Sequence, residues 1–190
     1  MIEVANISKK FGDRQVLSEV SMYLETGKVN MVIGQSGAGK SVFLKCLVGL
    51  LQTDVGEIHY DRRNFTEMNY QQKKELRQEI GMLFQGAALF DSLTVEQNVV
   101  FPLELFAKMS KSERLDRANF CLQRVNLINA NNLYPDEISG GMKKRVAIAR
   151  AIAMNPKYLF CDEPNSGLDP QTSIVIDNLI KEITQEFNMT

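Results

Sequence analysis

The sequence predicts an α/β fold: a mostly parallel sheet with helices, an N-terminal antiparallel β edge and an inserted helical subdomain. Two short apolar runs, Val29 to Ile33 and Tyr158 to Cys161, have the composition of buried parallel strands. Residues 87–154 contain no convincing strand and instead carry apolar residues at helical spacing. With 190 residues, 44% of them apolar, the chain is long enough for one core with a smaller satellite.

The N-terminal third alternates strand and helix patterns. Residues 1–33 alternate short strands with polar turns such as Phe11-Gly12-Asp13, which predicts the antiparallel edge. We expect a helix over residues 40–50, a strand over 56–61, and a charged helix from Thr66 to Glu79 that is capped by Thr66. In the inserted region a capping Ser112 precedes apolar residues at helical spacing, namely Leu115, Ala118, Leu122 and Val125.

A glycine-rich segment follows the first apolar run and fits the pattern G-x-x-x-x-G-K-[ST]. Its glycines allow consecutive N–H groups to point at phosphate oxygens from a helix N-terminus, while Lys40 supplies a charge and Ser41 a hydroxyl for a metal ion. The alternative is a glycine-rich turn before an ordinary helix, but the preceding strand and both terminal residues argue against it. We therefore predict a P-loop NTPase core with these nucleotide-binding residues: Gly34, Gln35, Ser36, Gly37, Ala38, Gly39, Lys40, Ser41 and Val42.

Two acids end the second apolar run, which lies between Pro156 and Pro164. Parallel sheets place their chemistry at the carboxyl ends of strands, so Asp162 is expected to hold Mg²⁺ with Ser41. Glu163 is then expected to polarise the water that attacks the γ-phosphate, with Lys40 stabilising charge. A pair of solvated acids at a strand end is the alternative, and the phosphate loop favours the catalytic interpretation. ATP and Mg²⁺ are the predicted cofactors.

A third motif, Ser139-Gly140-Gly141-Met142, precedes a basic helical stretch from Lys143 to Met154. Ser139 is a plausible N-cap, and the two glycines leave N–H groups that a second anion could approach. Because the chain already has a phosphate loop, we expect this helix start to serve the γ-phosphate held by a second copy. The working unit is then a homodimer. The alternative is a capped helix without a ligand.

The order of these motifs resembles the ATPase subunits of ABC transporters over essentially the whole chain. The matching segments are the phosphate loop, Gln85, Ser139-Gly140-Gly141, Asp162-Glu163 and Ser166-Gly167-Leu168-Asp169. This resemblance implies a single cassette in which residues 1–86 and 155–190 form a RecA-like nucleotide-binding core with the antiparallel β part. Residues 87–154 would form a helical subdomain that carries the signature motif.

The resemblance also implies roles for four further residues. Phe11 corresponds to the aromatic residue on which adenine stacks, with Val16 beside it, although a Phe near the N-terminus is often a core residue. Gln85 corresponds to a catalytic ligand of Mg²⁺ and water that also reports to the membrane partner. Asp169 corresponds to the residue that links the two sites of the dimer. The integral-membrane permease is expected to contact the region from Gln85 to Phe106.

A finer resemblance concerns the transported substrate. The stretches 81–91, 98–103 and 139–145 look like the Mla-type subfamily, which powers phospholipid transport between bacterial membranes and maintains outer-membrane lipid asymmetry. The resemblance implies a cytoplasmic protein that is peripheral on the inner face of the membrane. The net charge of −1 gives no basic excess, so no nucleic acid partner is expected. Soluble switch proteins of the same superfamily are the rival class, although they usually carry two cassettes.

Three features leave questions that the sequence does not decide. The apolar residues between Leu89 and Phe106 exceed what one helix face can bury, so they form either core or a surface groove for a permease helix. By the resemblance, His59 is too far upstream to be the switch histidine, and the strand that carries that histidine would follow Thr190. The sequence is thus expected to be a C-terminally truncated form, which could bind ATP without hydrolysing it. Cys46, Cys121 and Cys161 are expected to be reduced core thiols.

Overall fold

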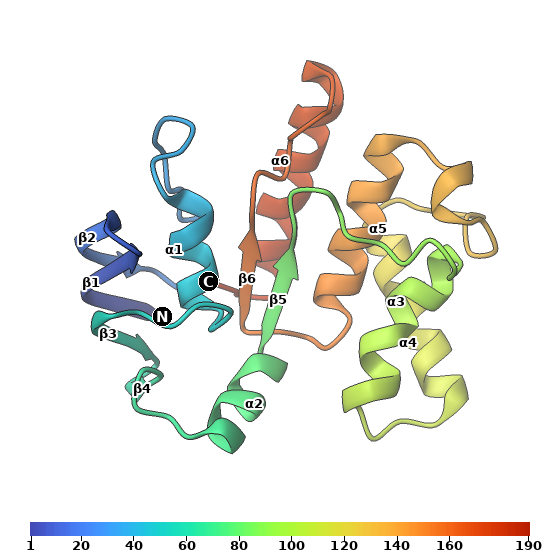
Figure 1. Ribbon diagram of the computed structural model, residues 1–190. Coiled ribbons are helices and arrows are strands. Elements are labelled where there is room, and N and C mark those ends of the chain that lie inside the picture. The colour runs from blue at the N-terminus through green and yellow to red at the C-terminus, as the bar shows by residue number, and fades with distance from the viewer. The chain divides into compact units, whose positions relative to one another are not determined.

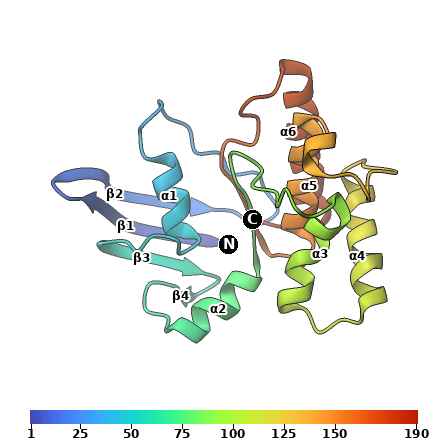
Figure 2. The same ribbon diagram turned by 45° about the vertical axis from the view of Figure 1, so that its right-hand side comes forward.

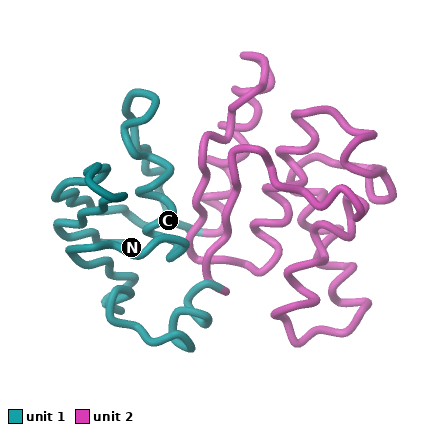
Figure 3. The backbone as a smooth tube through the Cα atoms, viewed as in Figure 1, with its two compact units in different colours: residues 1–77, 188–190 teal, residues 78–187 magenta.

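The computed structural model describes residues 1–190 and divides them into two compact units (Figure 3). The first unit comprises Met1–Arg77 and Asn188–Thr190, and the second comprises Gln78–Phe187. Each unit contains its own β-sheet and is described by itself. The helices all fall short of the length and apolar character that a membrane span requires.

The first unit is built on a four-stranded antiparallel sheet with the order β2-β1-β3-β4 (Figure 1). Its strands are β1 (Ile2–Phe11), β2 (Arg14–Leu24), β3 (Val55–Tyr60) and β4 (Arg63–Asn64). Gly12 takes the first position of the two-residue turn between β1 and β2 with a φ of 56°, which a glycine adopts at little cost. The predicted antiparallel edge and its turn are therefore confirmed.

Strand β1 keeps its apolar side chains on one face by means of a β-bulge. Ile2 and Val4 point into the core, and the register then shifts between Val4 and Ile7 so that Ile7 is buried as well. Asn6 has a φ of 51° at this irregularity. Gly56 of β3 lies against the bulge, because a Cβ added there would come within 2.5 Å of the Asn6 carbonyl. The apolar residues of this strand do not alternate strictly, and the bulge brings Ile7 back to the buried face.

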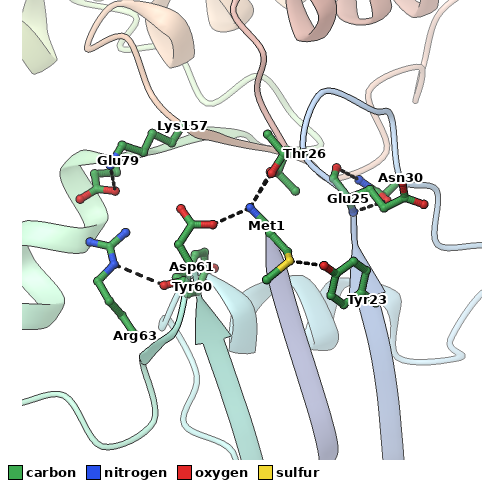
Figure 4. A network of polar contacts seen from close by, with 11 residues as sticks. Met1, Tyr23, Glu25, Thr26, Asn30, Tyr60, Asp61, Arg63, Glu79 and Lys157 are labelled. Atoms are coloured by element: carbon green, nitrogen blue, oxygen red, sulfur yellow. Dashed lines mark hydrogen bonds and ion pairs between the residues drawn. The ribbon is translucent and has the colours of Figure 1, made fainter.

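The N-terminus of the chain is held by several polar contacts in the first unit (Figure 4). The Met1 ammonium donates to Thr26 Oγ1 at 2.6 Å and to Asp61 Oδ1 at 2.7 Å. It also lies 3.3 Å from Thr190 Oγ1, and the N–H of Gly27 donates to the Met189 carbonyl at 2.7 Å. These contacts hold the last three residues of the chain beside the antiparallel sheet of the first unit.

The segment from Val29 to Ile33 does not form the buried strand that the sequence predicts. None of the six strands pairs with it, and its backbone has no regular secondary structure. Val29, Met31 and Ile33 are 51%, 78% and 83% exposed. An apolar run becomes a strand only when neighbouring strands take up its backbone hydrogen bonds, and no strand of either sheet pairs with this one.

Two helices belong to the first unit or its border. Helix α1 (Lys40–Leu47) confirms the helix expected after the glycine-rich loop. Helix α2 (Tyr70–Gln78) begins four residues later than expected. The predicted cap at Thr66 is wrong, because its Oγ1 accepts instead from the N–H of Ile58 at 3.0 Å. Asn69 caps the helix, since its Oδ1 accepts from the N–H of Gln72 at 3.0 Å.

The second unit combines a parallel pair of strands with a group of helices (Figures 1 and 2). Strands β5 (Ile80–Leu83) and β6 (Tyr158–Cys161) pair in register, Ile80 with Tyr158 and Leu83 with Cys161. The helices are α3 (Val95–Phe106), α4 (Lys111–Arg124), α5 (Gly140–Ile152) and α6 (Pro170–Glu186), with a 3-10 turn at Pro135–Glu137. Together with the antiparallel sheet, this parallel pair confirms the predicted α/β class.

Helix α5 lies between the strands and helices α3 and α4 of the second unit, as both views show (Figures 1 and 2). Gly81 permits its close approach to β5, because a Cβ there would come within 2.4 Å of the Ala151 carbonyl. Helix α4 begins after Ser110, whose Oγ accepts from the N–H of Glu113, so the predicted cap at Ser112 is wrong. Ser112 instead lies in the first turn, where the helix needs no further cap.

The apolar residues around α3 divide between core and surface. Val99 and Leu103 are buried, whereas Phe90, Leu105 and Phe106 are 43%, 58% and 46% exposed. The rings of Phe90 and Phe101 contact each other at a tilt of 51°, with their centroids 4.6 Å apart. Neither alternative of the sequence analysis therefore covers the whole set, because one face of the helix supplies core and the other leaves an apolar surface.

Candidate functional site

The glycine-rich loop of the first unit leads directly into a helix start. Gly37 and Gly39 have φ values of 79° and 94°, which side chains with a Cβ rarely adopt. Helix α1 begins at Lys40, directly after them, so the first-turn N–H groups face the loop without intrahelical partners. Such a helix start favours an anion through both its N–H groups and its dipole.

The Lys40 side chain folds back over this loop. Its Nζ donates to the carbonyl of Gly34 at 2.8 Å and to that of Gln35 at 3.0 Å. The ammonium thus lies at the mouth of the loop, where it adds a positive charge to the N–H groups of the helix start. This arrangement suits a polyanion such as a nucleotide triphosphate.

Strand β2 supports the loop from one side. A Cβ added to Gly39 would lie 3.1 Å from the Val16 carbonyl and 3.2 Å from its Cγ1. Val16 therefore packs against the loop. Phe11, at the end of β1, is 46% exposed, with Lys9 Nζ lying 5.6 Å from its ring centroid. Phe11 is thus not a core residue, and its aromatic ring is partly accessible.

The second unit brings together two of the predicted catalytic residues. The Gln85 side chain follows β5, and Glu163 follows β6, so both lie at the carboxyl ends of the parallel strands. Gln85 Nε2 donates to Glu163 Oε2 at 2.6 Å and lies 3.4 Å from Ser166 Oγ. Asp162 is 7% exposed beside them, and its N–H donates to the Leu83 carbonyl at 2.9 Å. Its backbone thereby extends the ladder between β5 and β6.

The main chain at this edge takes unusual conformations. Glu163 has a φ of 48°, and Ala87 and Ala88 have φ values of 63° and 50°. Non-glycine residues in this region are uncommon and must be held there by their surroundings. Side chains of helix α5 contact the main-chain carbonyls of these three residues.

Two cations of α5 donate to the carbonyls of this edge. Lys144 is only 4% exposed, and its Nζ donates to the Gln85 carbonyl and lies 3.5 Å from that of Glu163. Arg150 donates to the Ala87 and Ala88 carbonyls at 2.9 and 2.8 Å. Burial lowers the pKa of both cations, and for Lys144 the neighbouring Cys161 and Glu163 oppose this effect. No local pattern singles out either residue, because both lie within a stretch that contains several basic side chains.

The helix start of the third motif agrees with its predicted cap. Ser139 Oγ accepts from the N–H of Met142 at 3.3 Å, at the first turn of α5. Ser139 and Gly140 are exposed, whereas a Cβ at Gly141 would come within 2.8 Å of Thr172 in α6. Gly141 is therefore needed for the packing of two helices, and the exposed residues before it leave the helix start accessible.

Asp169 occupies a helix cap. Its Oδ1 accepts from the N–H of Thr172 at 3.0 Å at the start of α6. The bonds from Thr172 hold the pKa of Asp169 below its ordinary value. Its predicted part in linking two sites of a dimer needs a second chain and stays a prediction.

The three cysteines have no disulfide partner. Burial raises the pKa of all three thiols, to about 11 for Cys121 and to about 12 for Cys161. Thiols with so little thiolate are poor nucleophiles. Cys46 and Cys121 are buried, as expected for core thiols, whereas Cys161 is only half-buried. His59 lies in β3, where its Nε2 is 2.8 Å from Glu57 Oε2, as expected for a strand histidine.

The residues predicted to bind Mg²⁺ have the right chemistry for that ion. Ser41 offers a hydroxyl oxygen, Gln85 an amide oxygen and Asp162 a carboxylate, and Mg²⁺ prefers oxygen ligands of these kinds. No group of three or more His, Cys, Asp or Glu side chains is arranged to hold a metal ion. Ser41 belongs to the first unit, and Gln85 and Asp162 belong to the second.

The antiparallel sheet, the parallel pair and the phosphate-type loop define an α/β protein of the P-loop class. Sequence comparison then narrows the class, because residues 17–166 match the ABC transporter family. The chain belongs to the ABC transporter family.

Several similar proteins whose names state a function are longer than this chain. The "Methionine import ATP-binding protein MetN" of Clostridium tetani is 42% identical over 190 residues, which cover 100% of this chain and 59% of that protein. The "Probable ribonucleotide transport ATP-binding protein mkl" of Mycobacterium leprae is 40% identical over 189 residues, covering 100% and 54%. The chain therefore spans less than two thirds of the length of these relatives.

Solved structures share the fold. The ATP-binding cassette MJ0796, described as a dimer in a post-hydrolysis state with ADP and Pi, has a TM-score of 0.89 and 33% identity, covering 100% of this chain and 85% of that one. The cbiO1 protein of Clostridium perfringens, part of the transporter complex cbiONQ, has a TM-score of 0.90 and 30% identity, covering 100% and 75%. The mixed sheet arrangement described above is thus the fold of ABC cassettes.

Proposed function

We propose that this chain is the ATP-binding and ATP-hydrolysing part of an ABC transporter. The observation that carries the proposal is the loop of residues 34–41, in which two left-handed glycines and the Lys40 ammonium surround the start of α1. The match to the ABC transporter family supports it. In this proposal the loop binds the phosphates, Phe11 carries the adenine, and Val16 supports both.

Hydrolysis is assigned to the edge formed by β5 and β6. Glu163 polarises the attacking water, and Gln85 holds both that water and the carboxylate in place. Lys40 stabilises the charge that develops on the γ-phosphate. Mg²⁺, bound through Ser41, Gln85 and Asp162, would neutralise phosphate charge when present. Most of the rate enhancement then comes from positioning and electrostatics, as phosphoryl transfer requires.

A second copy of the chain completes each site in this proposal. The exposed, capped helix start at Ser139 to Met142 offers N–H groups to the γ-phosphate bound by the partner. Asp169 would link the two sites. The dimeric state described for the similar cassette MJ0796 supports this arrangement. Hydrolysis removes the shared γ-phosphate and so reopens the pair.

The permease contact is assigned to the apolar surface between Gln85 and Phe106. Phe90, Leu105 and Phe106 are exposed there, next to the buried face of α3. The surface begins at Gln85, which also contacts Glu163, so a bound permease helix could influence the catalytic edge. The protein would then be cytoplasmic and peripheral on the inner face of the membrane, without a nucleic acid partner.

The candidates for the transported substrate are a phospholipid, an amino acid and a ribonucleotide, the last because one relative is named for ribonucleotide transport. The cassette itself does not contact the substrate. The resemblance of three stretches to the Mla-type subfamily favours phospholipid transport. The relatives named for methionine import favour an amino acid. The gene neighbourhood separates them: a multispanning permease beside a periplasmic lipid-binding protein supports the lipid, whereas a periplasmic amino acid binding protein supports methionine.

The test of the ATPase proposal measures ATP binding by calorimetry and phosphate release by the encoded protein with Mg²⁺. Lys40→Ala should abolish ATP binding, since it removes the charge at the mouth of the loop. Lys45→Ala, on the exposed side of the same helix, is the matched control and should bind as the parent does. A parent protein that binds no adenine nucleotide would refute the proposal, and binding without phosphate release would leave a nucleotide-dependent switch as the function.

A further inference from the structure

The second unit contains a buried cation that the proposed chemistry does not use. Lys144 lies in the second turn of α5 and is 4% exposed. Its recorded hydrogen-bond acceptors are neutral main-chain carbonyls, those of Gln85 and Glu163. Burying an ammonium group against neutral acceptors generally costs more than burying an apolar side chain of similar size. Stability alone therefore does not explain a charge at this position.

The two carbonyls that Lys144 contacts belong to the two residues proposed to act on the water. They lie just beyond the ends of the paired strands β5 and β6, where the Gln85 and Glu163 side chains are joined by a hydrogen bond of 2.6 Å. Glu163 also has a left-handed backbone with a φ of 48°, which is unfavourable for a residue with a Cβ. An ammonium that binds both carbonyls fixes the main chain on which each side chain depends.

Helix α5 reinforces this edge at a second place. Arg150 donates to the carbonyls of Ala87 and Ala88, whose φ values are also positive. The turn after Gln85 is therefore held by two cations of one helix. That helix begins at Ser139, the proposed contact with the nucleotide of the partner. A displacement of α5 would thus move the carbonyls of the catalytic edge in the same molecule.

We propose that Lys144 is a positioning residue that holds the main chain of Gln85 and Glu163 and couples them to the start of α5. The inference rests on the proposed function. Lys144 does not contact the nucleotide in this role. It sets the direction of the Glu163 carboxylate and the Gln85 amide. When a nucleotide bound by the partner contacts Ser139, the resulting movement of α5 reaches these two side chains through Lys144.

The test compares three variants of the encoded protein. Lys144→Met keeps the length of the side chain but removes the charge and the donors, whereas Lys144→Arg keeps both. Lys143→Met is the matched control, because Lys143 is the adjacent lysine of the same helix and is only half-buried. Steady-state hydrolysis, the affinity for ATP, the Hill coefficient for ATP and thermal unfolding are measured for each.

Lys144→Met should lower kcat by about 10-fold to 100-fold, the size of effect that misplaced reacting groups produce. Its affinity for ATP should stay within about two-fold of the parent, because the phosphate loop is untouched, and its Hill coefficient should fall towards one. Lys144→Arg should recover most of kcat, and Lys143→Met should match the parent. Amide hydrogen exchange at residues 85–88 and 163–166 should be faster in Lys144→Met alone.

Two outcomes would overturn the inference. The first is a Lys144→Met protein with the kcat and Hill coefficient of the parent. The second is a loss of kcat that Lys144→Arg does not restore and that accompanies an equal loss of ATP affinity and of thermal stability, since this indicates a structural role only. The parent is assayed first, and a parent that binds or hydrolyses no ATP refutes the proposed function itself, and this inference with it.

Discussion

The side-chain amide of Gln85 donates a 2.6 Å hydrogen bond to the carboxylate of Glu163, although the two residues are 78 positions apart in the chain. The parallel pairing of β5 and β6 creates this contact, because it brings their carboxyl ends to the same edge. An acceptor carboxylate and a donor amide are thereby held beside Asp162. The chemistry proposed for this protein depends on that edge.

Glu163→Gln tests the base directly. The substitution keeps an oxygen acceptor for Gln85 but removes the negative charge, so ATP should still bind while kcat falls by about 100-fold to 1000-fold. Bound ATP that is not hydrolysed should also hold two chains together. Phosphate release and size-exclusion chromatography with ATP measure the two effects.

The control for this variant is Glu182→Gln, on the exposed surface of α6. It should behave as the parent in both assays. Normal turnover by Glu163→Gln would assign the base to another residue.

Ser139→Arg tests the contribution of the second chain. The arginine side chain is larger than serine and would occupy the exposed start of α5. It should therefore block closure of the dimer, while the affinity of one chain for ATP is unchanged. Analytical ultracentrifugation with ATP and calorimetry measure these separately. Ser139→Ala is the matched control, since it loses the helix cap, worth about 1 kcal/mol, without adding bulk. Dimers of Ser139→Arg that form with ATP as readily as the parent would contradict the proposal.

Gly81→Ala tests the packing of α5 on β5. The new Cβ would lie 2.4 Å from the Ala151 carbonyl, so the backbone of β5 or of α5 would have to shift. We expect the free energy of unfolding to fall by about 1 to 3 kcal/mol, which is the usual cost of overpacking a core. Gly86→Ala is the control, because no atom lies within 4 Å of its Cβ position. Chemical denaturation of the two proteins should therefore differ clearly, and equal midpoints would show that the helix can shift at no cost.

The cysteines should react slowly in the folded protein. Because burial raises the pKa of Cys121 to about 11 and of Cys161 to about 12, their thiolate fraction at pH 8 is far below that of a free thiol. Their reaction with a disulfide reagent should accelerate as pH rises towards those values and should become fast in denaturant. Titration of thiols in native and denaturing buffer measures this. Rapid labelling of all three at pH 8 in the folded state would contradict the assigned burial.

The local motifs were predictable because each depends on neighbouring residues. The phosphate loop, the start of α1 and the cap at Ser139 follow from glycine conformations and short-range hydrogen bonds that the sequence spells out. The caps at Thr66 and Ser112 failed for a related reason: a serine or threonine near a helix start is common, and the choice between neighbours depends on which side chain is free. Thr66 is used by β3 instead.

The sequence by itself determined the class of the protein, its phosphate loop and the residues that carry its proposed chemistry, since these are short patterns in the order of the chain. Only the tertiary structure decided that Val29 to Ile33 remains outside both sheets and that Lys144 is buried beneath Gln85 and Glu163. Strand pairing and the burial of a charge depend on partners far away in the sequence. The free energy of such contacts is set by the packed surroundings, and no local pattern contains that information.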